Sequence, residues 1–308
     1  MSLNADFLFD RRRLKRRLSF WRGLAIGALV VLVVTGVQLT LGELSSFGAR
    51  PHVARLNVTG LITEDRRLLD AIDDAVGSDA VEAILVNVDS PGGTVVGGES
   101  LYLALRKAAA EKPVVAVMGT TAASAGYMVA IAADTVFARA GTITGSIGVL
   151  FQTAEVTELL GKLGIESTTI KSSPLKAVPS PFEELTPEGR AATQSVVDST
   201  YAMFVDMVRE RRSLEPEQVA QVADGRIFTG RQALERKLVD AIGGEEDARA
   251  WLEAERKVSS ELPVFDIGVE EKESWIFGSA TALIRKTLLP ERLRLDGLLA
   301  LWHPSLRM

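Results

Sequence analysis

One serine occupies a position from which a side chain could act as a nucleophile. Ser124 lies in the run Thr-Thr-Ala-Ala-Ser-Ala-Gly-Tyr-Met at 120–128, after an apolar strand-like stretch at 113–118 and at the start of a helix-like stretch at 122–133. A serine at a strand-to-helix turn can be presented on a sharp bend, with helix-start N–H groups beside it to receive negative charge. A helix cap or a tightly packed turn fits the same residues, so this segment alone does not establish catalysis.

The composition limits which group could activate this serine. The chain has no cysteine and only two histidines, His52 and His303, which excludes thiol catalysis and cysteine-based metal sites. A Ser-His-Asp triad would have to use one of these flanking histidines. A carboxylate with a raised pKa or a lysine with a lowered pKa remains, and desolvation readily makes a lysine neutral. The composition therefore favours a Ser-Lys pair, and we expect neither a metal nor a cofactor.

A second chemical signal lies upstream, in Asp89-Ser90-Pro91-Gly92-Gly93 after the β-rich run at 81–88. We interpret it as a turn between a strand and a helix, in which glycines let the backbone approach a ligand closely. Backbone N–H groups of such a turn can stabilise an oxyanion. Two neighbouring strands of a parallel sheet end at the same edge, so Gly93 and Ser124 are expected to lie close together.

The elements that position these residues alternate between strand-like and helix-like patterns. The sequence predicts strands at 52–58, 81–88, 113–118, 135–138 and 165–170, with helices at 64–76, 97–111, 122–133 and 155–163. From about residue 186 the pattern becomes helical, with predicted helices at 186–212, 215–223, 231–237 and 245–256. Such alternation indicates an α/β fold with a mostly parallel sheet and helices on its faces.

An uncharged run of 20 residues at 23–42 has the length and composition of a transmembrane helix. Basic residues cluster in 1–22 before it, which predicts a cytoplasmic tail there and a chain outside the cytoplasm after a linker at 43–51. A cleavable signal peptide is the alternative interpretation of this segment. The part that follows is acidic overall, which argues against a nucleic-acid partner.

The C-terminal extension at 259–308 contains a weakly amphipathic stretch at 275–289 and an apolar one at 293–302. We expect a helix packed on the body of the protein. The alternative is a segment that docks on a neighbouring subunit or on the membrane surface. We also expect this extension to lie near an active-site groove and to modulate the entry of substrates.

Several motifs in a fixed order give the chain a family resemblance. They are SPGG at 90–93, AASAGYM at 122–128, TGSIGV at 144–149, KSSPLKAVPSP at 171–181, DGRIFTGRQA at 224–233 and LVDAIGG at 238–244. Over roughly residues 52–255 this pattern resembles the S49 serine peptidases, the signal peptide peptidases, and it suggests a peptidase domain at 52–258. The resemblance implies a Clp protease/crotonase-like core, a ββα spiral. It also implies a bacterial inner-membrane anchor, a periplasmic catalytic domain, a homo-oligomeric ring and cleavage of signal peptides.

The resemblance also assigns roles to individual residues. Ser124 matches the nucleophile and Lys176 the general base, while the backbone N–H groups of Gly93 and Ala125 match the oxyanion hole. Ser146 matches a serine that hydrogen-bonds the catalytic lysine. A neutral lysine needs an apolar setting and an acceptor that aims its amine, and the residues beside Lys176 carry little charge.

Some features depart from the family pattern or leave alternatives open. Lys171 is a rival base in the same motif, Ala125 stands where the family often has glycine, and Asp89 stands where asparagine is common. Short members of the family carry one catalytic serine and one catalytic lysine per chain, so the resemblance implies that neighbouring protomers complete each site. A catalytically idle membrane scaffold is an alternative to a peptidase, and so is a crotonase-like enzyme that acts on acyl thioesters.

Overall fold

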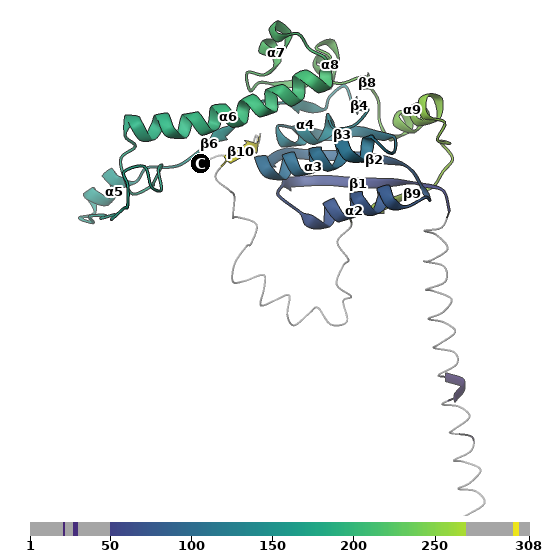
Figure 1. Ribbon diagram of the computed structural model, residues 1–308, viewed down its shortest axis with the longest axis horizontal. Coiled ribbons are helices and arrows are strands. Elements are labelled where there is room, and N and C mark those ends of the chain that lie inside the picture. The colour runs from purple at the N-terminus through teal and green to yellow at the C-terminus, as the bar shows by residue number, and fades with distance from the viewer. Residues whose placement is uncertain (1–20, 22–26, 30–49, 269–297, 302–308) are drawn as a thin grey trace, which may run out of the picture. The chain divides into compact units, whose positions relative to one another are not determined.

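The computed structural model describes Trp21 and residues 27–29, 50–268 and 298–301 (Figure 1). Contacts divide the chain into two units, Met1–Arg50 and Pro51–Met308. The predicted transmembrane segment at 23–42 lies outside the described residues except for 27–29, and the stretch at 275–289 lies outside them entirely. Within the described part, no helix combines the length and the apolar character that a membrane span requires.

A mostly parallel sheet forms the centre of the second unit, as the sequence predicts. Neighbouring parallel strands follow one another in the order β9 (Val264–Ile267), β1 (His52–Ile62), β2 (Val81–Thr94), β3 (Val114–Ala123), β4 (Thr135–Ala138) and β8 (Ala241–Ile242). Because they are parallel, the C-terminal ends of β2 and β3 lie at the same edge of the sheet. Gly93 is at the end of the first strand, and Ser124 directly follows the second.

Short strands extend the sheet at this edge. β5 (Ile143–Gly145) runs parallel to the last residues of β3, and β7 (Ile227–Thr229) is antiparallel to β5. β10 (Leu298–Leu301) is antiparallel both to the end of β2 and to β6 (Leu150–Phe151). The mixed edge therefore surrounds the positions that the sequence marks as chemically important.

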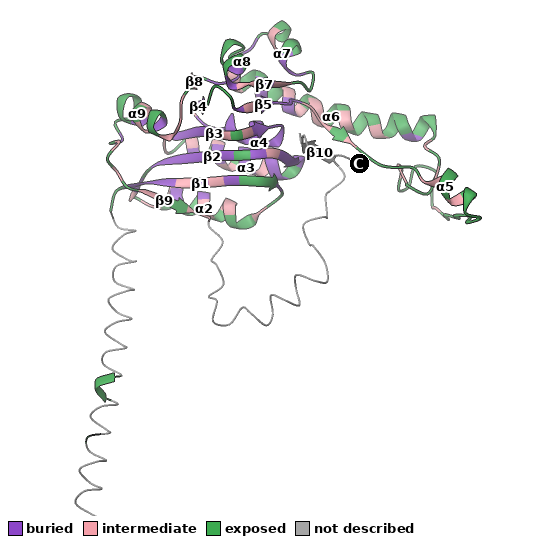
Figure 2. Cartoon of the chain, turned by 180° about the vertical axis from the view of Figure 1, so that it is seen from behind, coloured by how far each residue is buried: buried purple, intermediate pink, exposed green. Residues whose placement is uncertain are grey.

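Helices cover one face of the sheet. α2 (Arg66–Gly77), α3 (Val95–Ala109) and α4 (Ala125–Ala130) lie in front of the strands in Figure 1 and behind them in Figure 2. Ile72 of α2, Leu105 of α3 and Met128 of α4 are fully buried in one core with strand residues such as Val86. Alternate strand residues face this core, because successive side chains of a strand point to opposite sides.

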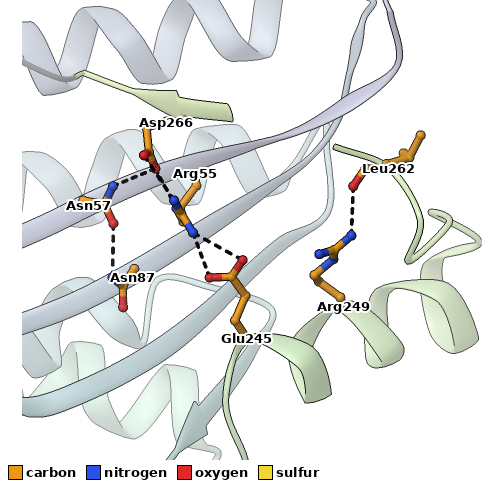
Figure 3. Close-up of polar contacts among 7 residues, drawn as sticks. All are labelled: Arg55, Asn57, Asn87, Glu245, Arg249, Leu262 and Asp266. Carbon is orange, nitrogen blue, oxygen red and sulfur yellow. Dashed lines mark hydrogen bonds and ion pairs between the residues drawn. The ribbon is translucent and has the colours of Figure 1, made fainter. Parts of the chain in front are cut away.

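The opposite face changes character along the strands. Its first half is apolar and packs Leu85 and Val115 against Leu252 of α9 (Glu245–Arg256). Further along, polar side chains take over and form the network in Figure 3. Asn87 donates to Asn57 at 3.1 Å, and Asn57 donates to Asp266 at 2.9 Å.

Arg55 closes this network. Its Nε donates to Asp266 at 2.6 Å, and its Nη1 donates to Glu245 at 3.1 Å. The hydrogen bond from Arg55 holds the pKa of the Asp266 carboxyl below its usual value. These contacts connect β1, β9 and the start of α9.

An arm extends from this body. It comprises residues 152–186, with α5 (Thr157–Lys162), and continues into α6 (Pro187–Arg212), as Figures 1 and 2 show. Thr186 caps α6 by accepting from the N–H of Gly189 at 3.1 Å. Two further helices of the second unit are α7 (Pro216–Val222) and α8 (Gly230–Glu235).

Three predicted elements are corrected by the structure. The helix predicted at 122–133 is shorter, because β3 runs to Ala123 and α4 begins at Ala125. The turn predicted at 90–93 is part of β2, because β1 continues to Ile62 and pairs with Gly92 and Gly93. The strand predicted at 165–170 is not formed, because these residues lie on the exposed arm without a neighbouring strand.

The expected C-terminal helix is also wrong at the residues that the structure describes. Leu298–Leu301 form the strand β10. The exposed edges of β2 and β6 supply backbone partners on both sides of this segment, which favours an extended conformation over a helix.

Candidate active site

Ser124 occupies a strained turn between β3 and α4. Its backbone has φ 57° and ψ −121°, a left-handed conformation that favours glycine. Its N–H donates to the carbonyl of Gly145 at 2.9 Å, and its own carbonyl accepts from the N–H of Met128 at 3.0 Å. Holding a non-glycine residue there costs on the order of 1–3 kcal/mol, and such strain is concentrated at functional sites.

The hydroxyl of Ser124 is buried and has no partner. The residue is 1% exposed, and in the part of the chain that the structure describes its Oγ is the only buried side-chain nitrogen or oxygen without a hydrogen bond. Leaving such a group unpaired costs roughly 1–3 kcal/mol. A base supplied from elsewhere would satisfy this hydroxyl and take its proton.

Small residues around the turn let the backbone segments approach closely. A Cβ added to Gly126 would lie 2.8 Å from the carbonyl oxygen of Ser90, and one added to Gly98 would lie 3.0 Å from the Cβ of Ala125. Such contacts are too short for most real side chains. The alanine- and glycine-rich sequence around Ser124 is therefore needed to press α4 against β2 and α3.

Two backbone N–H groups near Ser124 are candidates for an oxyanion hole. Gly93 lies at the end of β2, whose residue Ser90 pairs with Ala122 of β3. A Cβ on Gly93 would come within 1.8 Å of the carbonyl oxygen of Ile62, so no other residue fits. Ala125 is the first residue of α4, and the N–H of a first helical residue has no acceptor inside the helix.

Ser146 lies next to the turn that carries Ser124. It follows Gly145, which pairs with Ala123 at the end of β3. Its backbone has φ 50°, its N–H donates to the carbonyl of Arg226 at 2.8 Å, and the residue is 9% exposed. Its hydroxyl makes none of the hydrogen bonds found among the described residues, and it is therefore available to a side chain that enters the site.

Lys176 lies elsewhere in the same chain. It is exposed on the arm, in the loop between α5 and α6, and the Ser124 hydroxyl has no hydrogen bond to it. The neighbouring residue Ala177 has φ 60°, so this loop is strained as well. The structure thus brings together Gly93, Ser124, Ala125 and Ser146 and leaves the proposed base apart.

The rival base is already engaged. Lys171 forms an ion pair with Glu183 on the arm, and this hydrogen bond lowers the pKa of the Glu183 carboxyl. Lys176 has no such partner among the described residues. Of these two lysines on the arm, only Lys176 has an amine that is free to form a hydrogen bond with a group outside the arm.

Other polar residues hold the ends of the strands in place, and the sequence analysis missed most of them. Thr144 donates to the carbonyl of Ala122 at 2.7 Å, and Ser90 donates to the carbonyl of Gly60 at 2.7 Å. Asp89 accepts from the N–H of Thr121 at 3.0 Å and so links β2 to β3. The available signal for Ser90 and Thr144 was their place in the SPGG and TGSIGV motifs.

The fold and the site define a serine hydrolase built on a mostly parallel α/β sheet, with a buried serine on a strained turn at the edge of the sheet. The model of peptidase family S49 matches residues 106–259, and the chain belongs to this family of serine peptidases. Ser124, Ser146 and Lys176 lie inside the matched range, and Gly93 lies before it.

Individual relatives agree with this assignment. A Synechocystis sp. protein named "Putative protease" is 43% identical over 204 residues, which cover 66% of this chain and 73% of that protein. A Methanocaldococcus jannaschii protein with the same name is 38% identical over 213 residues, 69% of this chain and 68% of that one. An Enterococcus faecium protein named "Putative signal peptide peptidase SppA" is 35% identical over 234 residues, 75% of this chain and 64% of that one.

Proposed function

We propose that this chain is a serine endopeptidase that cleaves extended apolar peptides, signal peptides among them, with Ser124 as nucleophile and Lys176 as general base. The observation that carries the proposal is the buried, unpartnered hydroxyl of Ser124 on its strained turn. The name of the Enterococcus faecium relative supports signal peptides as substrates. Membership of a peptidase family favours this function over an acyl-thioester enzyme.

The reaction follows from the groups around Ser124. Lys176 takes the hydroxyl proton as the Ser124 oxygen attacks the scissile carbonyl, and the N–H groups of Gly93 and Ala125 stabilise the oxyanion. The intermediate collapses, and the leaving amine receives the proton from Lys176. Water then loses a proton to Lys176 and attacks the acyl-enzyme. As the bond to the Ser124 oxygen breaks, Lys176 returns the proton to that oxygen, and the acid product is released.

A second copy of the chain would complete the site. The arm that carries Lys176 exposes large apolar side chains, with Ile170 95% exposed, Leu163 66% and Phe182 51%. Apolar residues gathered on one exposed segment are characteristic of an interface. In a homo-oligomeric ring, the arm of one protomer would bury these apolar side chains against its neighbour. The same contact would bring Lys176 to the neighbour's Ser124, beside Ser146.

The location of the protein is part of the same proposal. Residues 23–42 would span the bacterial inner membrane, with 1–22 in the cytoplasm and the peptidase domain at 52–258 on the periplasmic side. The linker at 43–51 would keep that domain near the membrane, where cleaved signal peptides remain. We further propose that the sheet and its helices are a Clp protease/crotonase-like ββα spiral core.

The test is hydrolysis of a fluorogenic leucine-rich peptide by the full-length protein in detergent. We expect Ser124→Ala and Lys176→Ala each to lower kcat by about 10⁴-fold or more, as loss of a nucleophile or its base does in serine peptidases. Lys171→Ala is the matched control, a lysine removed from the same arm, and it should keep its activity.

Two outcomes would contradict the proposal. Wild-type protein that assembles but does not hydrolyse peptides would indicate a scaffold or another substrate class. Activity lost only in Lys171→Ala would show that Lys176 is not the base.

A further inference from the structure

β10 fills a gap between two strand edges beside the candidate active site. On one side, Leu299, Ala300 and Leu301 pair with Thr94, Gly93 and Gly92 of β2. On the other side, Leu298 and Leu299 pair with Phe151 and Leu150 of β6. Both pairings are antiparallel, and Figure 1 shows the short strand β10 next to β6.

The pairing fixes the edge of β2 on which β10 lies. A strand has two edges, and β1 takes one of them, since Ile62 pairs with Gly93. β10 must therefore lie on the other edge, the one that β3 occupies up to the pair of Ser90 with Ala122. Because β3 ends at Ala123, β10 begins where the pairing of β3 with β2 stops, next to the turn of Ser124.

We propose that residues 298–301 occupy the path of the peptide substrate, so that a substrate must displace this internal strand to reach Ser124. The inference rests on the proposed peptidase function. An extended peptide in this slot would bind to backbone groups of β2 and β6 at once, as peptides do when they add a strand to a sheet. It would run antiparallel to β2 and bring a backbone carbonyl to Gly93.

The sequence of the strand agrees with this role. Residues 298–301 read Leu-Leu-Ala-Leu, an uncharged apolar run of the type that the proposed substrates contain. The slot is one strand wide, since β10 pairs on both sides in the same few residues. Occupation by the chain itself lowers the apparent affinity for a peptide in proportion to the fraction of time that the slot is free.

The test is the double variant Leu299→Pro/Ala300→Pro in the full-length protein. In an antiparallel strand with two neighbours, the N–H groups of successive residues face opposite edges, so two successive prolines remove a donor from each ladder. We expect KM for the leucine-rich peptide to fall about tenfold if the strand fills the slot about nine-tenths of the time, with kcat unchanged.

Two further variants keep this test decisive. Leu299→Val/Ala300→Val changes the same positions but retains both donors and should behave as wild type. A chain that ends at residue 297 lacks the strand and should reproduce the lower KM of the proline variant, even if the prolines disturb folding.

A binding measurement separates this inference from the proposed function. In a Ser124→Ala background, a labelled peptide that contains Leu-Leu-Ala-Leu should bind more tightly to the proline variant, as measured by fluorescence anisotropy. If the proline variant binds the peptide more tightly but the wild type hydrolyses no peptide, residues 298–301 do fill a peptide-binding slot and the proposed peptidase function is wrong.

Three results would overturn the inference. The first is hydrolysis with the same KM in all variants, and the second is peptide affinity that the prolines do not change. The third is wild-type protein cut within 298–301 while Ser124→Ala stays intact, because the strand would then be a substrate.

Discussion

Ser124 combines two unfavourable features in one residue. Its backbone takes a conformation that costs on the order of 1–3 kcal/mol, and its buried hydroxyl lacks a hydrogen bond worth a similar amount. If the side chain had only a structural role, glycine at this position would avoid the backbone strain, and either glycine or alanine would avoid the unpaired hydroxyl. The coincidence of both is better explained by a nucleophile that waits for its base.

The substitution Gly93→Ala tests how closely the backbone is packed around the proposed oxyanion donors. A Cβ in Gly93→Ala would meet the backbone of Ile62 at 1.8 Å, so the strand ends must move apart. We expect the free energy of unfolding in urea to fall by about 1–3 kcal/mol, as overpacking usually causes, with loss of peptidase activity.

Gly77→Ala is the matched control for this substitution. Gly77 is the last residue of α2, and a Cβ there meets nothing within 4 Å. Replacing it should leave activity unchanged and raise stability by up to about 1 kcal/mol, because alanine has less freedom in the unfolded chain. Equal effects of the two substitutions would mean that the packing at Gly93 is not restrictive.

At the scale of elements, the sequence was informative where patterns were long and buried. The run at 81–88 and the helix at 245–256 are recovered, because apolar periodicity reflects the core on each face of the sheet. The strand predicted at 165–170 is absent, because β-rich residues form a strand only when another strand is available to pair with them.

The same reasoning explains the boundary errors at the site. Ala122 and Ala123 fit a helix by propensity, but pairing with β5 and β2 holds them in β3. Glycines at 92–93 suggest a turn, but β1 runs alongside and keeps them extended. In both places, pairing with a neighbouring strand determines the conformation, and the local sequence pattern does not reveal that neighbour.

The polar network on the second face of the sheet predicts a pH dependence. Because Arg55 lowers the pKa of Asp266 in the folded state, the ionised carboxylate stabilises the fold above the unfolded-state pKa of about 4. This contribution is lost as the pH falls through the lower, folded-state value. Asp266 is partly exposed, so we expect Asp266→Asn to cost only about 0.5 kcal/mol at pH 7.

Urea unfolding at several pH values checks this expectation. The difference between wild type and Asp266→Asn should shrink as the pH is lowered below about 4. Asp70→Asn, which changes an exposed carboxylate on α2, should show no such difference. A gap for Asp266→Asn that persists at low pH would mean that the side chain acts through packing and not through charge.

Within the whole chain, the two members of the predicted dyad, Ser124 and Lys176, lie apart from each other. Sequence motifs predicted Ser124 and Lys176 as one dyad, and the family resemblance implied that two neighbouring protomers complete it. In the structure, the arm exposes Lys176 to solvent and the body buries Ser124. Spacing along one chain does not report which copy of a protein supplies each residue. The proximity of Gly93 to Ser124 was predictable from the order of the parallel strands, whereas Ser146 was placed in the site only by the family resemblance. The position of Lys176 on an exposed arm was not predictable from the spacing.

Mixing two inactive variants tests whether the site is shared between copies. Ser124→Ala keeps Lys176, and Lys176→Ala keeps Ser124, so an interface that joins the two can carry one intact site. In a random mixture, about a quarter of the interfaces in a cyclic assembly pair the intact serine with the intact lysine. We expect peptidase activity to recover to about that fraction of wild type after joint refolding or co-expression.

The matched control mixes Ser124→Ala with a Ser124→Ala/Lys176→Ala double variant, which supplies no serine and should stay inactive. If the first mixture also stays inactive while its assembly matches wild type by size-exclusion chromatography, serine and lysine must act within one chain. Full activity in a diluted, monomeric wild-type sample would have the same meaning.

The separation of Lys176 from Ser124 has a consequence for the life of the protein in the cell. A newly synthesised copy would carry a latent peptidase site until another copy supplies Lys176. Its activation would depend on meeting other copies, so peptide cleavage should rise more steeply than in proportion to expression level. Sparse copies would then be harmless to neighbouring proteins, and proteolysis would begin only where the chain has accumulated.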